Sequence, residues 1–297
     1  GKTTFTGVFS EQKSQTKSVT SQGGGTIQDF ELFALDYDSD RHYFLSQYFR
    51  NKYDKALENY PYINSRVQIT RLEVWITNKQ NRVSTTDNNL RNIVALQDLG
   101  EAQISGISDA EIVGVPNPGF FTASPDTPSD NNNNKFNPNG IGNNFLNSSI
   151  RDVSTALNGF NIPGMAEGID FAKLENARKL AASEFTFHPQ LGYLSLNQKL
   201  ANDEVLAVAY QYTIGDQVFQ VGEFGTDGVD ATNVDNAGVP SSQALVLKML
   251  KGNLVVVEEP VWDLMMKNVY NIGGYGINKE NFYLNLLLKH RQKQKKQ

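Results

Sequence analysis

Apolar side chains between residues 40 and 60 recur at steps of three and four, the spacing of one helix face. We therefore expect a helix from Asp40 to Asn59. Ser39 or Asp40 can accept the free amide hydrogens of its first turn, and Pro61 ends it because the residue before a proline avoids the helical region. The aromatic stripe favours packing on a sheet, with a ligand groove as the alternative. Its members are Leu45, Tyr48, Phe49, Tyr53, Ala56, Leu57 and Tyr60.

A long strand is predicted directly after this helix, from Arg66 to Asn78. Its apolar residues change phase midway, so a β-bulge near Thr70 would restore one buried face. Trp75 would then point to the other face, which indicates that this face is covered as well. The predicted partner strand is Arg91–Leu99. The apolar residues before the bulge are Val67 and Ile69, and those after it are Leu72, Val74 and Ile76.

The segment from Ser183 to Phe224 has the pattern of two β-hairpins. The first joins Glu184–Phe187 to Tyr193–Leu196 through the turn sequence HPQLG, which places proline and glycine where a turn uses them. In the second hairpin, apolar and polar residues alternate along the first strand, Val205–Ile214, and the returning strand is Gln217–Phe224. The two residues between these strands, Gly215 and Asp216, form a typical two-residue hairpin turn.

Both ends of the chain carry shorter strand candidates. Near the start these are Thr3–Ser10, Thr16–Thr20 and Thr26–Leu35, which contain β-branched residues at amphipathic spacing. Near the end, Leu245–Leu250 and Asn281–Lys289 are apolar. Alternate residues of the last segment line one face, which fits either a buried strand or a lipid-facing strand of a barrel.

Pro116–Asn147 is the clearest linker, because its proline- and asparagine-rich sequence buries too little to offset the entropy of ordering it. Ser148–Leu157 is a short predicted helix capped by Ser148 or Ser149, and Gly225–Pro240 is a predicted polar loop. These breaks divide the chain into five predicted parts. Residues 1–38 hold the N-terminal strands and are candidate barrel wall, residues 39–115 form a helix-plus-strand subdomain, and residues 116–147 form a flexible loop. Residues 148–240 form a β-hairpin subdomain, and residues 241–297 form a C-terminal segment that is a candidate return to the barrel wall.

Composition narrows the functional classes. The chain has 297 residues and a net charge of −5, and this acidic balance argues against a nucleic-acid partner, which would require a basic surface. It contains no cysteine, which excludes disulfides, thiolate metal sites and a cysteine nucleophile. No apolar run reaches the roughly 20 residues of a membrane-spanning helix. The start has no signal-peptide pattern, and we expect the chain to be a segment of a longer protein.

The residues that could bind a metal are sparse. His42, His188 and His290 do not stand at metal-ligand spacing from one another, so we expect packing or surface roles for them. Asp36, Asp38 and Asp40 alternate as calcium ligands do, but Arg41 and Gln47 occupy the positions where an EF-hand needs glycine and glutamate. Asp38 and Asp40 are explained more simply as residues at the start of a helix, where the helix dipole favours acidic side chains. The sequence therefore predicts no metal and no cofactor.

No catalytic motif is present. The sequence lacks a nucleophile elbow, a Walker loop and a dinucleotide fingerprint, and the glycines of Asn271–Ile277 (NIGGYGI) have the wrong spacing for a phosphate loop, so we expect a turn there. A pair of carboxylates for hydrolysis stays open as an alternative, because their separation is a property of the folded chain. We expect no catalytic residue and no enzymatic activity.

Several long blocks, in order, resemble the SprA (Sov) family, the outer-membrane translocon of the type IX secretion system, and in particular its large N-terminal repeated domain. The intervening Pro/Asn-rich loop carries no family signal. The matching blocks are GVFSEQKSQTKSV (7–19), Asp40–Asn78, RNIVALQDLGE (91–101), EFTFHPQLGYLSLN with DEVLAVAYQYT (184–213), and PVWDLMMKNVY (260–270).

The resemblance implies a mainly β fold with minor α, part of a very large outer-membrane β-barrel with inserted surface or cap subdomains. It implies a structural and gating role in a protein-conducting channel for type IX secretion and gliding motility. The implied partners are the rest of the barrel, a periplasmic plug protein, an outer-membrane shuttle protein, secreted proteins with a C-terminal signal, and lipid at the wall strands. The alternative is a soluble, non-catalytic cell-surface module that binds glycan or peptide.

Overall fold

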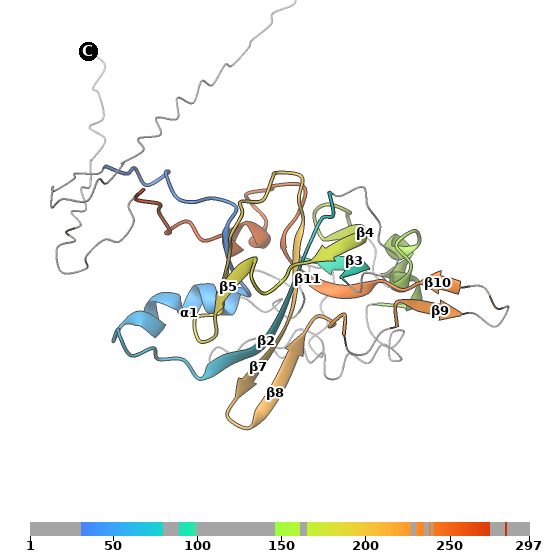
Figure 1. Cartoon of the computed structure of the whole chain (residues 1–297), viewed down its shortest axis with the longest axis horizontal. Helices are drawn as coiled ribbons and strands as arrows, with labels where there is room; N and C mark the ends of the chain where they lie inside the picture. The colour runs from blue at the N-terminus through green and yellow to red at the C-terminus, as the bar shows by residue number, and fades with distance from the viewer. Residues whose placement is uncertain are drawn as a thin grey trace, which may run out of the picture. The chain divides into compact units, whose positions relative to one another are not determined.

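Short strands dominate the part of the chain described by the computed structural model, and helices are few (Figure 1). The described residues are 31–79, 89–97, 99, 146–160, 165–226, 230–234, 238, 240–273 and 283. The chain divides into two compact units, residues 1–37 with 270–297 and residues 38–269. All the named helices and strands belong to the second unit.

Five strands close into a small barrel in the order β2, β7, β11, β3, β4. β11 and β3 run parallel and the other neighbours run antiparallel. β7 pairs with β2 along one edge, whereas its other edge pairs with β11 near the start and with β8 near the end. The bounds are β2 Val67–Ile76, β3 Leu90–Leu96, β4 Phe171–Lys179, β7 Leu206–Ile214, β8 Gln217–Val221 and β11 Leu245–Lys251.

Side chains from all five strands fill the barrel interior. Several of them are alanines, which suits the narrow space that so few strands enclose. Trp75 is fully buried among them, and Phe224 enters from the segment after β8. The outer faces of these strands are also covered, as the complete burial of Val94 and Val208 shows. The interior cluster is Trp75, Ile93, Ala95, Ala172, Ala177, Val205, Ala207, Ala209, Phe224, Leu245, Leu247 and Met249.

β2 confirms the predicted bulge, because its register against β7 shifts between Ile69 and Arg71. The covered second face around Trp75 is confirmed as well. The predicted pairing of β2 with the next strand was wrong, since β4 lies between β2 and β3. The sequence analysis did not predict β4. Its strand pattern is interrupted at Asn176, a residue with a left-handed backbone (φ 51°), where the register of β4 against β3 shifts.

A second sheet has three strands, in the order β1 (His42–Phe44), β6 (Tyr193–Leu196) and β5 (Phe185–His188). Helix α1 (Gln47–Leu57) follows β1 in the sequence. The helix predicted from Asp40 therefore begins too early. Asp40 has a left-handed backbone (φ 58°), which cannot start a helix, and the next residues form β1 instead. Ser46 stands at the cap position, although its side chain makes no capping hydrogen bond.

The other local predictions had mixed outcomes. Both hairpins, β5–β6 and β7–β8, are confirmed. The predicted loop after Gly225 contains a small hairpin of β9 (Thr232–Val234) and β10 (Pro240–Ser242). The predicted helix from Ser148 is instead two 3₁₀ turns, and the residue that caps the first turn is Asn147, whose side chain accepts from the Ser149 amide. These turns are η2 (Ser148–Arg151) and η3 (Ala156–Gly159), and a further turn, η4, spans Pro260–Leu264.

The predictions for the two ends lie almost wholly outside the described residues. Thr3–Ser10 and Thr16–Thr20 are not described, nor is Asn281–Lys289 apart from the exposed Tyr283. The described end of Thr26–Leu35, residues 31–35, is not strand. β11 belongs to the chain's own small barrel, whereas participation in a larger barrel stays a prediction. Among the described residues, none of the helices is both long and apolar enough to span a membrane.

Candidate functional site

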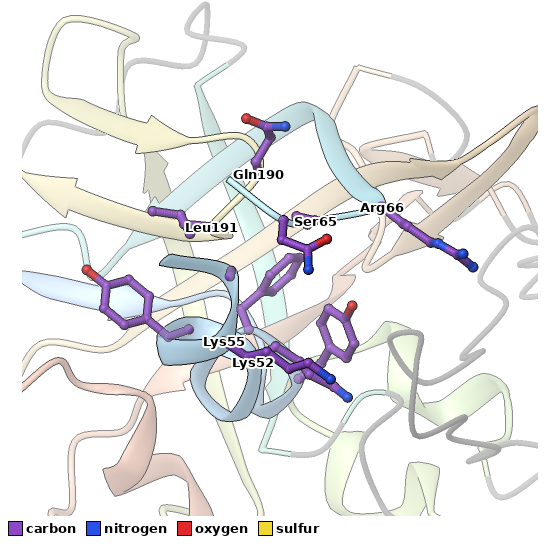
Figure 2. Close-up of a pocket in the computed structure, with 11 residues that line it drawn as sticks. Lys52, Lys55, Ser65, Arg66, Gln190 and Leu191 are labelled. Atoms are coloured by element: carbon purple, nitrogen blue, oxygen red, sulfur yellow. The ribbon is translucent and has the colours of Figure 1, made fainter. Parts of the chain in front are cut away.

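A groove lies beside helix α1 in the second unit. Its cavity measures about 290 Å³. Figure 2 shows that three segments supply its walls: α1 with Lys52 and Lys55, the segment before β2 with Ser65 and Arg66, and the turn of the β5–β6 hairpin with Gln190 and Leu191. The full lining is Tyr48, Phe49, Lys52, Tyr53, Lys55, Ala56, Asn64, Ser65, Arg66, Gln190 and Leu191.

Helix α1 is held in place at both of its ends. At its start, the Gln47 side chain donates to the Pro260 carbonyl of η4 (2.6 Å). At its end, the Asn64 amide donates to the Ala56 carbonyl (2.9 Å), which folds the following loop back along the helix. Phe49 and Ala56 are buried, and the ring of Tyr53 contacts that of Phe44 edge-on at 5.3 Å. The helix therefore presents a fixed face to the groove.

The hairpin turn packs directly on this helix, and Gly192 makes that approach possible. Its backbone is left-handed (φ 60°), and a Cβ atom there would lie 2.2 Å from the Phe49 ring. Its carbonyl accepts from the Leu45 amide (2.8 Å). The neighbouring Pro189 carbonyl accepts from the Ile69 amide of β2 (2.8 Å), so the same turn is attached to the barrel. Three parts of the fold thus meet around the groove.

The groove is cationic. Lys52, Lys55 and Arg66 line it, and none of the described residues in its lining is acidic. Within the described residues, the side chains of Lys55 and Arg66 form no ion pair. Burial, together with the neighbouring Tyr193 and Asp54, raises the pKa of Tyr53, which keeps its hydroxyl protonated at neutral pH.

The groups that line this groove are suited to binding. Its described lining includes one serine and contains no histidine and no carboxylate. That Ser65 hydroxyl donates to the Val67 carbonyl (3.1 Å). Tyrosine rings and apolar carbons provide a floor, whereas lysine, arginine and amide groups provide donors at the rim. An arrangement of this kind suits recognition of an anionic, partly apolar group.

A second charged group lies buried where Glu73 of β2 meets the segment after β8. The Glu73 carboxylate, nearly buried, accepts from the Gly225 amide (2.9 Å) and from Lys179 of β4 (3.3 Å). The Lys179 ammonium also lies 5.9 Å from the Trp75 ring centre. These contacts tie β2, β4 and the crossing segment together beside the filled interior.

Glu223 and Arg151 form a neighbouring buried pair. Two parallel hydrogen bonds of 2.6 and 2.7 Å join guanidinium and carboxylate, and the Val246 amide donates to the same carboxylate at 2.8 Å. Arg91 donates to the Gly225 carbonyl (3.3 Å), and burial lowers its pKa. The buried charges are occupied with one another, so we assign this group to cohesion of the barrel. Its members come from distant segments, and no sequence spacing could have grouped them.

The three aspartates considered for calcium each have a different partner. Asp36 lies in the first unit and accepts from the Phe33 amide (2.9 Å). In the second unit, Asp38 accepts from the Arg41 guanidinium (3.0 Å), whereas Asp40 faces the Lys199 ammonium at 3.9 Å. Across the described part of the chain, no three His, Cys, Asp or Glu side chains converge as metal ligands.

The two described histidines take part in packing and hydrogen bonding. His42 lies 2.8 Å from the Ser195 hydroxyl and 3.4 Å from the Asp38 carboxylate. His188 stacks on Tyr193 and accepts from the Leu191 amide (3.2 Å). His290 lies outside the described residues.

Only Asn271–Gly273 of the glycine-rich segment are described, and the turn expected over Asn271–Ile277 stays a prediction. The Gly273 amide donates to the Asn271 side chain at 2.8 Å, and the Gly273 backbone is left-handed (φ 70°). The remainder of that segment, 274–277, is not described.

A family model, SprA_N, described as a motility related/secretion protein, matches residues 1–214. This span holds every residue of the groove and four of the five barrel strands, and β11, which completes the barrel, lies beyond it. No curated protein matches the chain.

Proposed function

The chain belongs to the SprA_N family of motility related and secretion proteins, and on that premise we propose that it is a structural, non-catalytic part of a protein-conducting channel. Its function relates to motility or secretion. The finer proposal is a structural and gating role in the outer-membrane channel that secretes proteins by the type IX route and supports gliding.

The filled five-stranded barrel is the observation that carries this proposal. A barrel whose centre is occupied by Trp75, Phe224 and rows of alanines offers no passage of its own. Its buried ion pair between Arg151 and Glu223 fixes distant segments against one another. Such a body is suited to forming a rigid wall or cap beside a passage that lies outside it.

The proposed partners follow from the same family premise. They are the remainder of the channel, a periplasmic plug protein, an outer-membrane shuttle protein and cargo with a C-terminal secretion signal, with lipid at the candidate wall strands and no nucleic acid. The proposed location is the outer membrane, on its periplasmic or surface side.

A soluble binding module on the cell surface is the second candidate function. The groove beside α1 favours it, because tyrosines and cations line a cavity large enough for a peptide side chain or a sugar. The two candidates differ in what cells lose when the protein is absent. Loss of a binding module leaves secretion running, whereas loss of a channel part stops it.

Conditional depletion of the protein in its native cells tests the proposal. The readout is the export of a reporter enzyme fused to a C-terminal secretion signal, with a reporter exported by another route as the control. We expect the signal-bearing reporter to accumulate in the periplasm while the control is exported normally. Undiminished export of the first reporter after depletion would contradict a role in the channel.

A further inference from the structure

We propose that the groove beside α1 binds an acidic peptide segment that carries an apolar or aromatic side chain. This inference goes beyond the structural role proposed above and does not depend on it, because it rests on the groove alone. The local charge, the apolar floor and the donors at the rim of the groove all fit such a peptide.

The local charge of the groove is opposite to that of the whole chain. The chain carries a net charge of −5, yet Lys52, Lys55 and Arg66 line one cavity, and no acidic residue is found among its described walls. Within the described residues, the side chains of Lys55 and Arg66 form no ion pair, so their charges are available to an anion that enters the groove.

The floor of the groove is apolar. Phe49, Ala56 and Leu191 are buried side chains that contribute carbon surface to the cavity. A volume of about 290 Å³ lies near the lower end of the range for small-molecule sites and has room for about one or two large side chains. An occupant that combines carboxylates with one apolar or aromatic group satisfies both the rim and the floor.

The rim supplies hydrogen-bonding groups suited to a peptide main chain. Asn64 and Gln190 carry amides that can donate and accept, and the protonated Tyr53 hydroxyl can donate. These groups come from three segments that are fixed to one another, so the site exists before its ligand arrives. An anionic polysaccharide would match the cations but would leave the apolar floor without a partner, and for this reason we favour a peptide.

Direct binding to the full 297-residue chain tests the proposal. The probe is a fluorescent peptide of alternating Asp and Glu around a single Phe, measured by anisotropy at low salt and again at about 0.5 M salt. Two comparison peptides replace the acids by Asn and Gln, or the Phe by Ser. We expect saturable binding of the first peptide, a loss of tenfold or more for each comparison peptide, and weakening by salt.

Two variants with equal charge changes locate the binding. In the groove variant, Lys52, Lys55 and Arg66 are each replaced by Gln. In the control variant, three exposed cations that do not line the groove are replaced by Gln in the same way, namely Arg50, Lys79 and Lys199. We expect the groove variant to lose tenfold or more in affinity and the control to stay within about twofold. Circular dichroism verifies that both variants are folded.

Three results would overturn the proposal. They are the absence of saturable binding, equal losses in the two variants, and binding of dextran sulfate that depends on the groove while the peptide fails to bind. Because the readout is binding in solution, each of these results would leave the proposed role in secretion standing. Undiminished export after depletion would contradict that role and would leave the groove proposal standing.

Discussion

Gly192 shows how one residue sets the geometry of the groove, since it combines a left-handed backbone with close contact to Phe49. We predict that Gly192→Ala lowers the free energy of unfolding by about 2–4 kcal/mol, because strain and steric overlap add. Gly215→Ala is the matched control: that turn has a similar backbone (φ 58°) but open space around the site, so we expect about 1 kcal/mol. Urea denaturation measures both, and equal losses would contradict the packing described for the hairpin turn.

The buried pair of Arg151 and Glu223 makes a second prediction at the residue scale. Glu223→Gln leaves a nearly buried guanidinium without its counter-charge, and we expect a loss of about 3–5 kcal/mol in unfolding free energy. The control is Glu184→Gln, which weakens a partly exposed pair with Arg178 and should cost about 1 kcal/mol or less. Denaturant midpoints compare the two variants. A loss at Glu223 as small as that at Glu184 would show that the buried pair does not hold the barrel.

His188 gives the hairpin turn a predicted dependence on pH. Burial lowers its pKa below the ordinary value of about 6.5, and its neutral ring accepts from the Leu191 amide. The unfolded chain therefore binds a proton at a higher pH than the folded chain does, so stability falls as pH drops below about 6.5. Urea midpoints at pH 7.5 and 5.5 should differ less in His188→Gln than in the wild type. An identical difference in both proteins would contradict this assignment.

At the scale of elements, the sequence predicted what depends on neighbouring residues. The phase change around Thr70 predicted the bulge in β2, and the turn residues Gly215 and Asp216 predicted the β7–β8 hairpin. The start of α1 was misplaced because an aromatic stripe read at helical spacing does not reveal that Asp40 has a left-handed backbone or that β1 pairs with β6.

Pairings between distant segments could not be predicted in this way. The barrel closes where β11 joins β3 and β7, which are far away along the chain, and β4 separates two strands that were expected to be partners. The groove too is formed by segments that lie far apart in the sequence. The helical pattern marked Tyr48 and Tyr53, but only folding brings Arg66 and Gln190 to the same cavity.

The linker gives a prediction at the element scale. The proline- and asparagine-rich sequence of residues 116–143 predicts little burial, so replacing that stretch by a short Gly/Ser linker should change the unfolding free energy by less than about 1 kcal/mol. Extending the deletion through Asn147 also removes the buried Leu146 and the cap of η2, and we expect a further loss of about 2–5 kcal/mol. Circular dichroism and urea titration check both. Loss of the β signal in the shorter deletion would show that the stretch is needed for folding.

At the scale of the whole molecule, the second unit is a small closed barrel with an attached sheet and helix. Residues that fill its interior, such as Trp75, should affect how much folded protein the cell retains. A catalytic site would behave differently, since one substitution there can remove function while the fold persists. The relation between stability and export across a set of variants therefore distinguishes a structural role from a catalytic one.

The most direct test measures export of the signal-bearing reporter in cells that carry wild type, Gly215→Ala, Gly192→Ala or Glu223→Gln. A structural role predicts that export and the level of folded protein fall together, in the order of the measured unfolding free energies. Wild-type export from cells in which Glu223→Gln has depleted the folded protein would contradict the account.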